Sequence, residues 1–102
     1  MIEVSPLDRV LVLPLDERGG IRALARGEAL VGMGTLEQVR AARRELADLE
    51  NVMFAVGSRS DIPWQEHWFT LIVDREGGAA TEAMMRVLAE GGRILTDVQG
   101  LP

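Results

Sequence analysis

The stretch VMFAVGSRSDIPWQEHWFTLIVDREGGAATEAMMRVLAEGGRIL, residues 52–95, decides the fold. Its apolar runs at 52–57 and 68–74 predict two buried strands that are joined by a loop. A helix is expected over about 80–90, where a glycine pair would end it, and a further strand is expected over 93–98. Strands that alternate with helices are typical of an α/β layer fold.

The chain before this stretch continues the same alternation. A nearly all-apolar run at 9–13 predicts a strand covered on both faces, and Pro14 would end it because proline cannot donate to the ladder. A short helix is expected over about 20–26 with Gly27 as its C-cap, and another strand over 29–33.

A second helix is expected to begin at Thr35, because Gln38 three residues later completes a capping-box pattern. Apolar residues at helical spacing predict its buried stripe, which consists of Leu36, Val39, Ala42, Leu46 and Leu49. The same segment carries a small basic cluster, Arg40, Arg43 and Arg44. Acidic residues interleave with these arginines, which favours a solvated helix face over a binding site for nucleic acid.

Right-handed crossovers place the five strands, numbered along the chain, in the order 3-2-1-4-5 of an open parallel sheet. The first two helices would then cover one face and the third helix the other face. Ligands of such sheets bind beyond the carboxyl ends of the strands, at the switch point between strands one and four. That crevice would be rimmed by residues 14–20, Gly34, Ser58 and residues 74–78.

Length, charge and composition limit the function. A chain of 102 residues makes one domain, spanning 1–102, and its net charge of -5 argues against nucleic-acid and anionic-membrane surfaces. The chain has no cysteine, and its only histidine is His67, so neither disulfides nor a metal site is expected. It has no run long enough to span a membrane and no signal-peptide pattern, which makes the cytoplasm the expected location.

The segment MRVLAEGGRIL, residues 85–95, resembles the hR-V-L-x-x-G-G-R-h-h segment of class I S-adenosylmethionine (SAM)-dependent methyltransferases of the type 11-like kind. Framework residues resemble the family in the same order, namely Asp8-Arg9-Val10-Leu11, Val31-Gly32, Asn51-Val52, Asp61-Ile62-Pro63-Trp64 and residues 69–74. The resemblance implies a Rossmann-like α/β core with SAM in the switch-point crevice. The family's additional C-terminal helix and β-hairpin have no counterpart in this sequence.

The residues with which the family holds its cofactor are mostly replaced. The glycine-rich turn after strand one corresponds to Pro14, Asp16 and Arg18, and the glycines Gly19 and Gly20 follow just too late. The acidic residue that would hold the ribose corresponds to Gly34. The resemblance therefore implies a vestigial crevice formed by Asp16, Gly19, Gly20, Gly34, Ser58 and Asp74, with no catalytic residue and no bound cofactor expected.

A degenerate, non-catalytic methyltransferase-like domain that serves as an oligomerisation or partner-binding module is the leading hypothesis. One alternative is an active small methyltransferase with an altered SAM site, and another is a binder of a different nucleotide-like metabolite. A homodimer is expected, either through edge strand five or through the apolar face of Trp64, Trp68, Met84 and Met85, because an uncovered edge or apolar face favours association.

Overall fold

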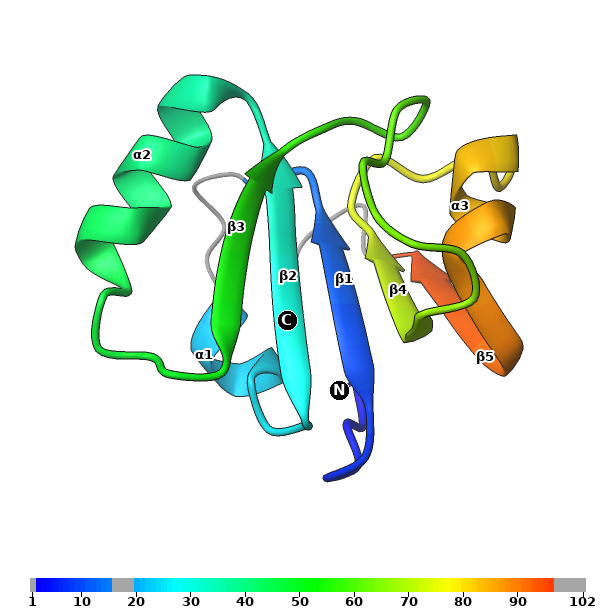
Figure 1. The fold of residues 1–102 in the computed structure, drawn as a ribbon, viewed down its shortest axis with the longest axis horizontal. Helices are drawn as coiled ribbons and strands as arrows, with labels where there is room; N and C mark the ends of the chain where they lie inside the picture. The colour runs from blue at the N-terminus through cyan, green and yellow to red at the C-terminus, as the bar shows by residue number, and fades with distance from the viewer. Residues whose placement is uncertain (1, 16–19, 97–102) are drawn as a thin grey trace.

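The protein is described by a computed structural model that covers residues 2–15 and 20–96. One sheet contains the strands of this part of the chain, β1 (Arg9–Leu13), β2 (Ala29–Gly34), β3 (Val52–Val56), β4 (Phe69–Asp74) and β5 (Leu88–Thr96). All neighbouring strands are parallel, and their order is β3-β2-β1-β4-β5 (Figure 1). The predicted fold class and strand order are confirmed.

The two central strands lie side by side and form the most deeply buried part of the protein. In β1 and β4, Leu11 pairs with Ile72, and Leu13 pairs with Asp74. The side chains of Val10, Leu11, Val12, Leu71, Ile72 and Val73 are all 0% exposed. Uniform burial on both faces explains why these strands are continuous apolar runs rather than alternating ones.

Helices cover both faces of the sheet, as predicted (Figure 1). The helices α1 (Ile21–Leu24) and α2 (Leu36–Glu45) pack on one face, whose core includes Val10, Leu30, Val39 and Val73. The helix α3 (Glu82–Val87) packs on the opposite face, whose core includes Leu11, Val31, Phe69 and Met84. The sheet therefore separates two apolar cores, each closed by different segments of the chain.

The capping box of α2 is confirmed. The Gln38 N–H donates to Thr35 Oγ1 at 3.2 Å, and the Thr35 N–H donates to Gln38 Oε1 at 2.9 Å. Val39 and Ala42 are buried as predicted, but Leu36 is 50% exposed. Leu36 follows the last residue of β2 by only two positions, so it lies where the sheet has ended and no strand can cover it.

The third predicted helix is shorter than expected, since it ends at Val87 and β5 begins at Leu88. Leu88 pairs with Phe69 of β4, and the register then shifts before the next pair, Leu71 with Arg93. Gly91, with φ of 77°, lies in this bulge. Pairing with β4 therefore overrides the helical pattern at 88–90, and the glycine pair permits a bulge instead of capping a helix.

The first helix is also shorter than predicted, and Gly27 does not cap it. A Cβ at Gly27 would collide with the backbone oxygen of Asp8. Gly27 is therefore required for a close approach between two backbone segments, not for a left-handed conformation.

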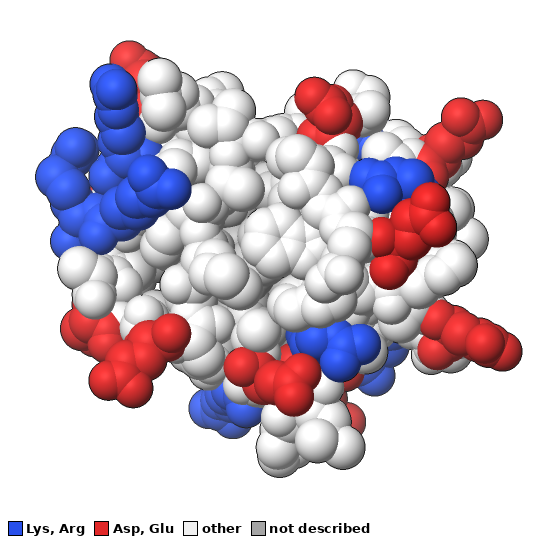
Figure 2. Space-filling model, in the orientation of Figure 1, with Lys and Arg blue, Asp and Glu red and all other residues white. Residues whose placement is uncertain are grey.

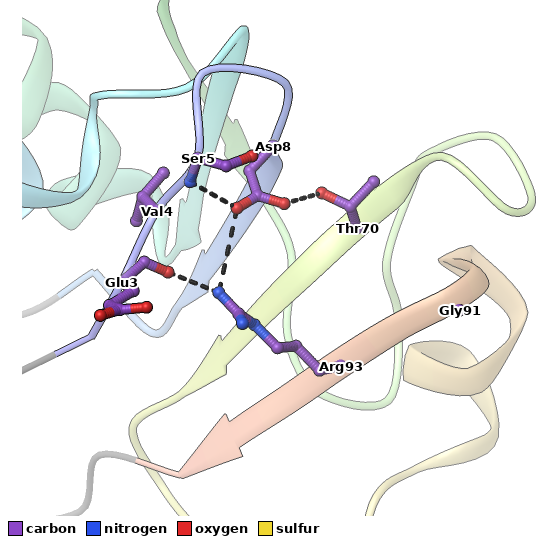
Figure 3. A pocket seen from close by; sticks show the side chains of 7 residues that line it. All are labelled: Glu3, Val4, Ser5, Asp8, Thr70, Gly91 and Arg93. Carbon is purple, nitrogen blue, oxygen red and sulfur yellow. Dashed lines mark hydrogen bonds and ion pairs between the residues drawn. The ribbon is translucent and has the colours of Figure 1, made fainter.

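The segment before β1 is fixed to the sheet by a polar cluster at the amino end of the strands (Figure 3). The Asp8 carboxylate accepts hydrogen bonds from the Ser5 N–H at 2.8 Å and from the Thr70 hydroxyl at 2.7 Å. Arg93 donates to the backbone oxygen of Glu3 at 2.5 Å, and its guanidinium lies 3.9 Å from Asp8. The cluster joins the N-terminal segment, β4 and β5.

Partial burial acts to raise the pKa of Asp8, but the hydrogen bonds from Ser5 and Thr70, together with the Arg93 charge, outweigh it and hold the pKa below its ordinary value of 3.8. A depressed carboxyl pKa stabilises the folded state above the unfolded-state pKa, and this contribution is lost as the pH falls through the folded-state pKa.

We expect Asp8→Asn to lower the free energy of unfolding near neutral pH, because it removes the charge that the cluster favours. The difference from the wild type should narrow when the pH is lowered below the folded-state pKa of Asp8, where the wild-type carboxylate becomes protonated. Urea unfolding at both pH values measures this effect. Glu3→Gln, which removes a nearby carboxylate but leaves the backbone contact to Arg93, is the control. A constant difference between Asp8→Asn and the wild type would contradict the assignment.

Candidate functional site

The candidate crevice lies at the carboxyl ends of β1, β2 and β4, where the strand order reverses (Figure 1). Backbone contacts continue past the ends of the strands at this edge. The Leu15 N–H donates to Met33 O of β2 at 2.8 Å, and the Arg75 N–H donates to Leu13 O of β1 at 2.8 Å. Chain segments beyond the strands thus remain close to the sheet at the switch point.

Leu15 occupies the space above the end of β2 and is only 4% exposed. A Cβ added at Gly32 would lie 2.6 Å from Leu15 Cδ2, and a Cβ added at Gly34 would lie 3.2 Å from Leu15 Cβ. The Leu15 side chain therefore rests directly on glycine backbone, and it belongs to the core that contains Val12 and Val39. An apolar side chain fills the place beside Gly34, the position that corresponds to the family's ribose-binding acid.

Asp74, at the end of β4, is 0% exposed, and hydrogen bonds engage both of its carboxylate oxygens. One oxygen accepts from Arg59 Nη2 at 2.9 Å, and the other accepts from the N–H groups of Glu76 and Gly77 at 3.1 and 3.2 Å. A buried carboxylate requires such partners because desolvation penalises an unpaired charge. Both oxygens of the Asp74 carboxylate are therefore hydrogen-bonded within the protein, and Asp74 has a structural role in this conformation.

Arg59 was not among the predicted site residues, although it completes the crevice. Its guanidinium also donates to Ala79 O at 2.8 Å, and its backbone oxygen accepts from the Thr81 hydroxyl at 2.5 Å. These contacts connect the loop after β3 with the segment that caps α3. An arginine in a loop has no periodicity that indicates its partner, so the pair could not be found from the sequence.

Two of the other predicted site residues, Gly20 and Ser58, make hydrogen bonds within their own turns. Gly20, with φ of 82°, caps α1 and accepts a hydrogen bond from the Leu24 N–H. Ser58 is exposed after β3, where its N–H donates to Asp61 O. Asp16 and Gly19 lie outside the described residues. The structure thus brings Gly34, Ser58 and Asp74 to one edge of the sheet, with Leu15 and Arg59 occupying the space between the strand ends and the loops.

A second hollow of about 420 Å³ lies at the opposite, amino end of the sheet (Figure 3). It is lined by Glu3, Val4, Ser5, Asp8, Thr70, Gly91 and Arg93. Asp8, Thr70 and Arg93 are already bonded to one another or to the N-terminal segment. We therefore interpret this hollow as the surface of the polar cluster described above.

Within residues 2–15 and 20–96, no group of three or more His, Cys, Asp or Glu residues could hold a metal ion. No helix of this part of the chain has both the length and the apolar character needed to cross a membrane.

Comparison with known proteins found no matching family model and no matching curated protein. Similar solved structures include a putative methyltransferase in complex with the Haloferax volcanii Trm112 methyltransferase activator, with a TM-score of 0.73 and 23% identity over 91% of this chain and 46% of that chain. A geranyl diphosphate methyltransferase in complex with GPP and sinefungin gives a TM-score of 0.70 and 20% identity over 92% of this chain and 39% of that chain.

A putative methyltransferase from Pseudomonas syringae gives a TM-score of 0.68 and 23% identity, over 93% of this chain and 66% of that chain. The chain spans less than half the length of the first two structures and about two thirds of the third. At these identities the likeness concerns the fold. The chain has the methyltransferase-like Rossmann fold, reduced to one open five-stranded sheet in its described residues.

Proposed function

We propose that this domain is a non-catalytic version of the methyltransferase fold, which acts through its surface as an oligomerisation or partner-binding module. The observation that carries the proposal is the burial of Leu15 against Gly32 and Gly34. A buried apolar side chain beside Gly34 leaves less room for a cofactor at the position where the resemblance expects a ribose-binding acid.

The energetic cost of cofactor binding supports this proposal. Displacing Leu15 would forfeit the ~1.5–3 kcal/mol that burial of a leucine side chain contributes. The absence of a carboxylate at Gly34 forfeits a further ~1.5–3 kcal/mol, the usual contribution of a hydrogen bond to a charged group. The combined penalty corresponds to roughly a hundredfold to ten-thousandfold in the dissociation constant. A micromolar site would thereby become at best a weak, near-millimolar one.

The Arg59–Asp74 pair adds a second obstacle. Among the described residues, Asp74 is a carboxylate at the switch point, and its two oxygens already have three partners. A ligand that recruits Asp74 would have to break its contact with Arg59. Removing one partner of a buried pair costs about 3–5 kcal/mol.

An active SAM-dependent methyltransferase with an altered cofactor site is the second candidate function. It is favoured by the solved structures that share this fold and are named methyltransferases. One of them is in complex with an activator protein, so a partner could in principle complete a site on such a scaffold. This candidate requires SAM to enter the crevice that Leu15 occupies.

Calorimetric titration of the protein with SAM and with S-adenosylhomocysteine separates the two candidates. We expect no saturable binding in the micromolar range, because Leu15 packs against Gly34 and that position lacks the ribose-binding acid. Circular dichroism of the same sample verifies that the protein is folded. A micromolar dissociation constant for either compound would overturn the proposed function.

The variant Leu15→Ala tests whether the Leu15 side chain stabilises the core or lines a cofactor site from which it can be displaced. We expect a loss of about 2–5 kcal/mol in the free energy of unfolding, the usual cost of truncating a buried leucine. Leu36→Ala makes the same change at a half-exposed position and should cost within about 0.5 kcal/mol. Urea unfolding measures both variants. If Leu15→Ala were as stable as the wild type and bound SAM, Leu15 would be the lining of a usable cofactor site.

A further inference from the structure

The face of the sheet opposite α1 and α2 has an incomplete cover. In the described residues it is covered by α3 and by the loop between β3 and β4 (Figure 1). Figure 2 shows this side as a broad field with few charged atoms at its centre. We name it the open face.

Apolar side chains emerge on the open face. Met53 of β3 is 43% exposed. It lies on the open face because Ala55, two positions along the same strand, packs against the core under α3, and residues two apart in a strand share a face. Trp64 and Trp68 are partly buried, with ring centroids 5.5 Å apart. Met85 on α3 is 55% exposed, whereas Met84, which was predicted to contribute to this surface, is completely buried.

Both edges of the sheet carry features that discourage strand pairing. At the β3 edge, Asn51 O accepts a hydrogen bond from β2, and the Gly57 N–H donates one to β2. Backbone groups of successive strand residues point to alternate sides, so those of Phe54 point away from the sheet. Arg43 donates to the outward Phe54 O at 3.2 Å. At the other edge, β5 has a bulge and exposed charged residues, including Arg93. Charged side chains and bulges are common protection for edges, which makes the open face the better candidate for association.

The charges that frame the open face differ between its two sides, although an acidic group also lies below the basic one on the side of α2 (Figure 2). Basic groups gather over α2, where Arg40, Arg43 and Arg44 are exposed. Acidic groups predominate around α3 and the loop before β4, where the exposed residues include Asp61, Glu66 and Glu82. A two-fold axis lying in the plane of this face would bring the basic end of each copy against the acidic end of the other copy.

We propose that the open face binds a second copy of this chain in a two-fold dimer. The inference rests on the proposed function, in which the domain acts through its surface. The protein measures 32 × 28 Å across the viewed face, which is large enough for the ~800 Å² per partner of a standard interface. Apolar side chains at the centre and charges at the rim are the usual arrangement of such an interface.

Light scattering of the purified protein at tens of micromolar is expected to give twice the chain mass of 11.2 kDa. Met53→Asp should weaken dimerisation at least tenfold, because it places a charge among the exposed apolar side chains of this face. Leu7→Asp is the matched control, since Leu7 is 79% exposed in the turn before β1 and should leave the dimer intact. Unfolding midpoints of both variants verify that they are folded.

A charge exchange tests the orientation of the two copies. Arg40→Glu combined with Arg44→Glu, and Glu66→Arg combined with Glu82→Arg, should each give a monomer, and mixing the two variants should restore a dimer. Arg43 stays unchanged because it holds the edge of β3. A wild-type monomer, a dimer insensitive to Met53→Asp, or a mixture that stays monomeric would each overturn the proposal. SAM binding by a dimer would instead overturn only the proposed function.

Discussion

The contact between Leu15 and the glycine backbone at the end of β2 is the constraint on which the rest of the carboxyl edge depends. Gly32 and Gly34 have no Cβ, so Leu15 can lie directly on the strand and join the core between the sheet and α2. A bare backbone at this edge would suit a cofactor equally well. Here the Leu15 side chain packs on that backbone, and its burial contributes to the stability of the fold.

The carboxyl edge of the sheet and the open face are connected by the loop between β3 and β4. Arg59 of this loop neutralises Asp74 and accepts a hydrogen bond from Thr81 at the start of α3. Further along, Arg86 of α3 donates to the backbone oxygens of Ile62 and Trp64. The same loop therefore supplies the partner of Asp74 and carries Trp64, whose backbone oxygen is held by α3. A loop free to admit a ligand would lose part of this rigid, apolar surface.

The strands, their order and the capping box could be predicted because each depends on local patterns or on the handedness of crossovers. The conformation of Leu15 could not be predicted, because Pro14 ends the strand pattern. No local signal indicates that the Leu15 N–H donates to Met33 O of the neighbouring strand. The partner of Arg59 is equally non-local, since its carboxylate is supplied by β4. Residues 88–90 have a pattern that predicts a helix, but they belong to β5. The pairing of Leu88 with Phe69 outweighs their helix propensity.

Several residues around Gly34 constrain one another. An acidic side chain introduced at Gly34 would meet Leu15 and the carboxamide oxygen of Gln38. Gln38 cannot easily move, because that oxygen accepts the Thr35 N–H in the capping box of α2. Accommodating an acidic side chain at Gly34 thus requires Leu15 to move and the start of α2 to adjust together. Neighbouring substitutions that share contacts are not additive, so a change at Gly34 cannot be considered apart from Leu15 and Gln38.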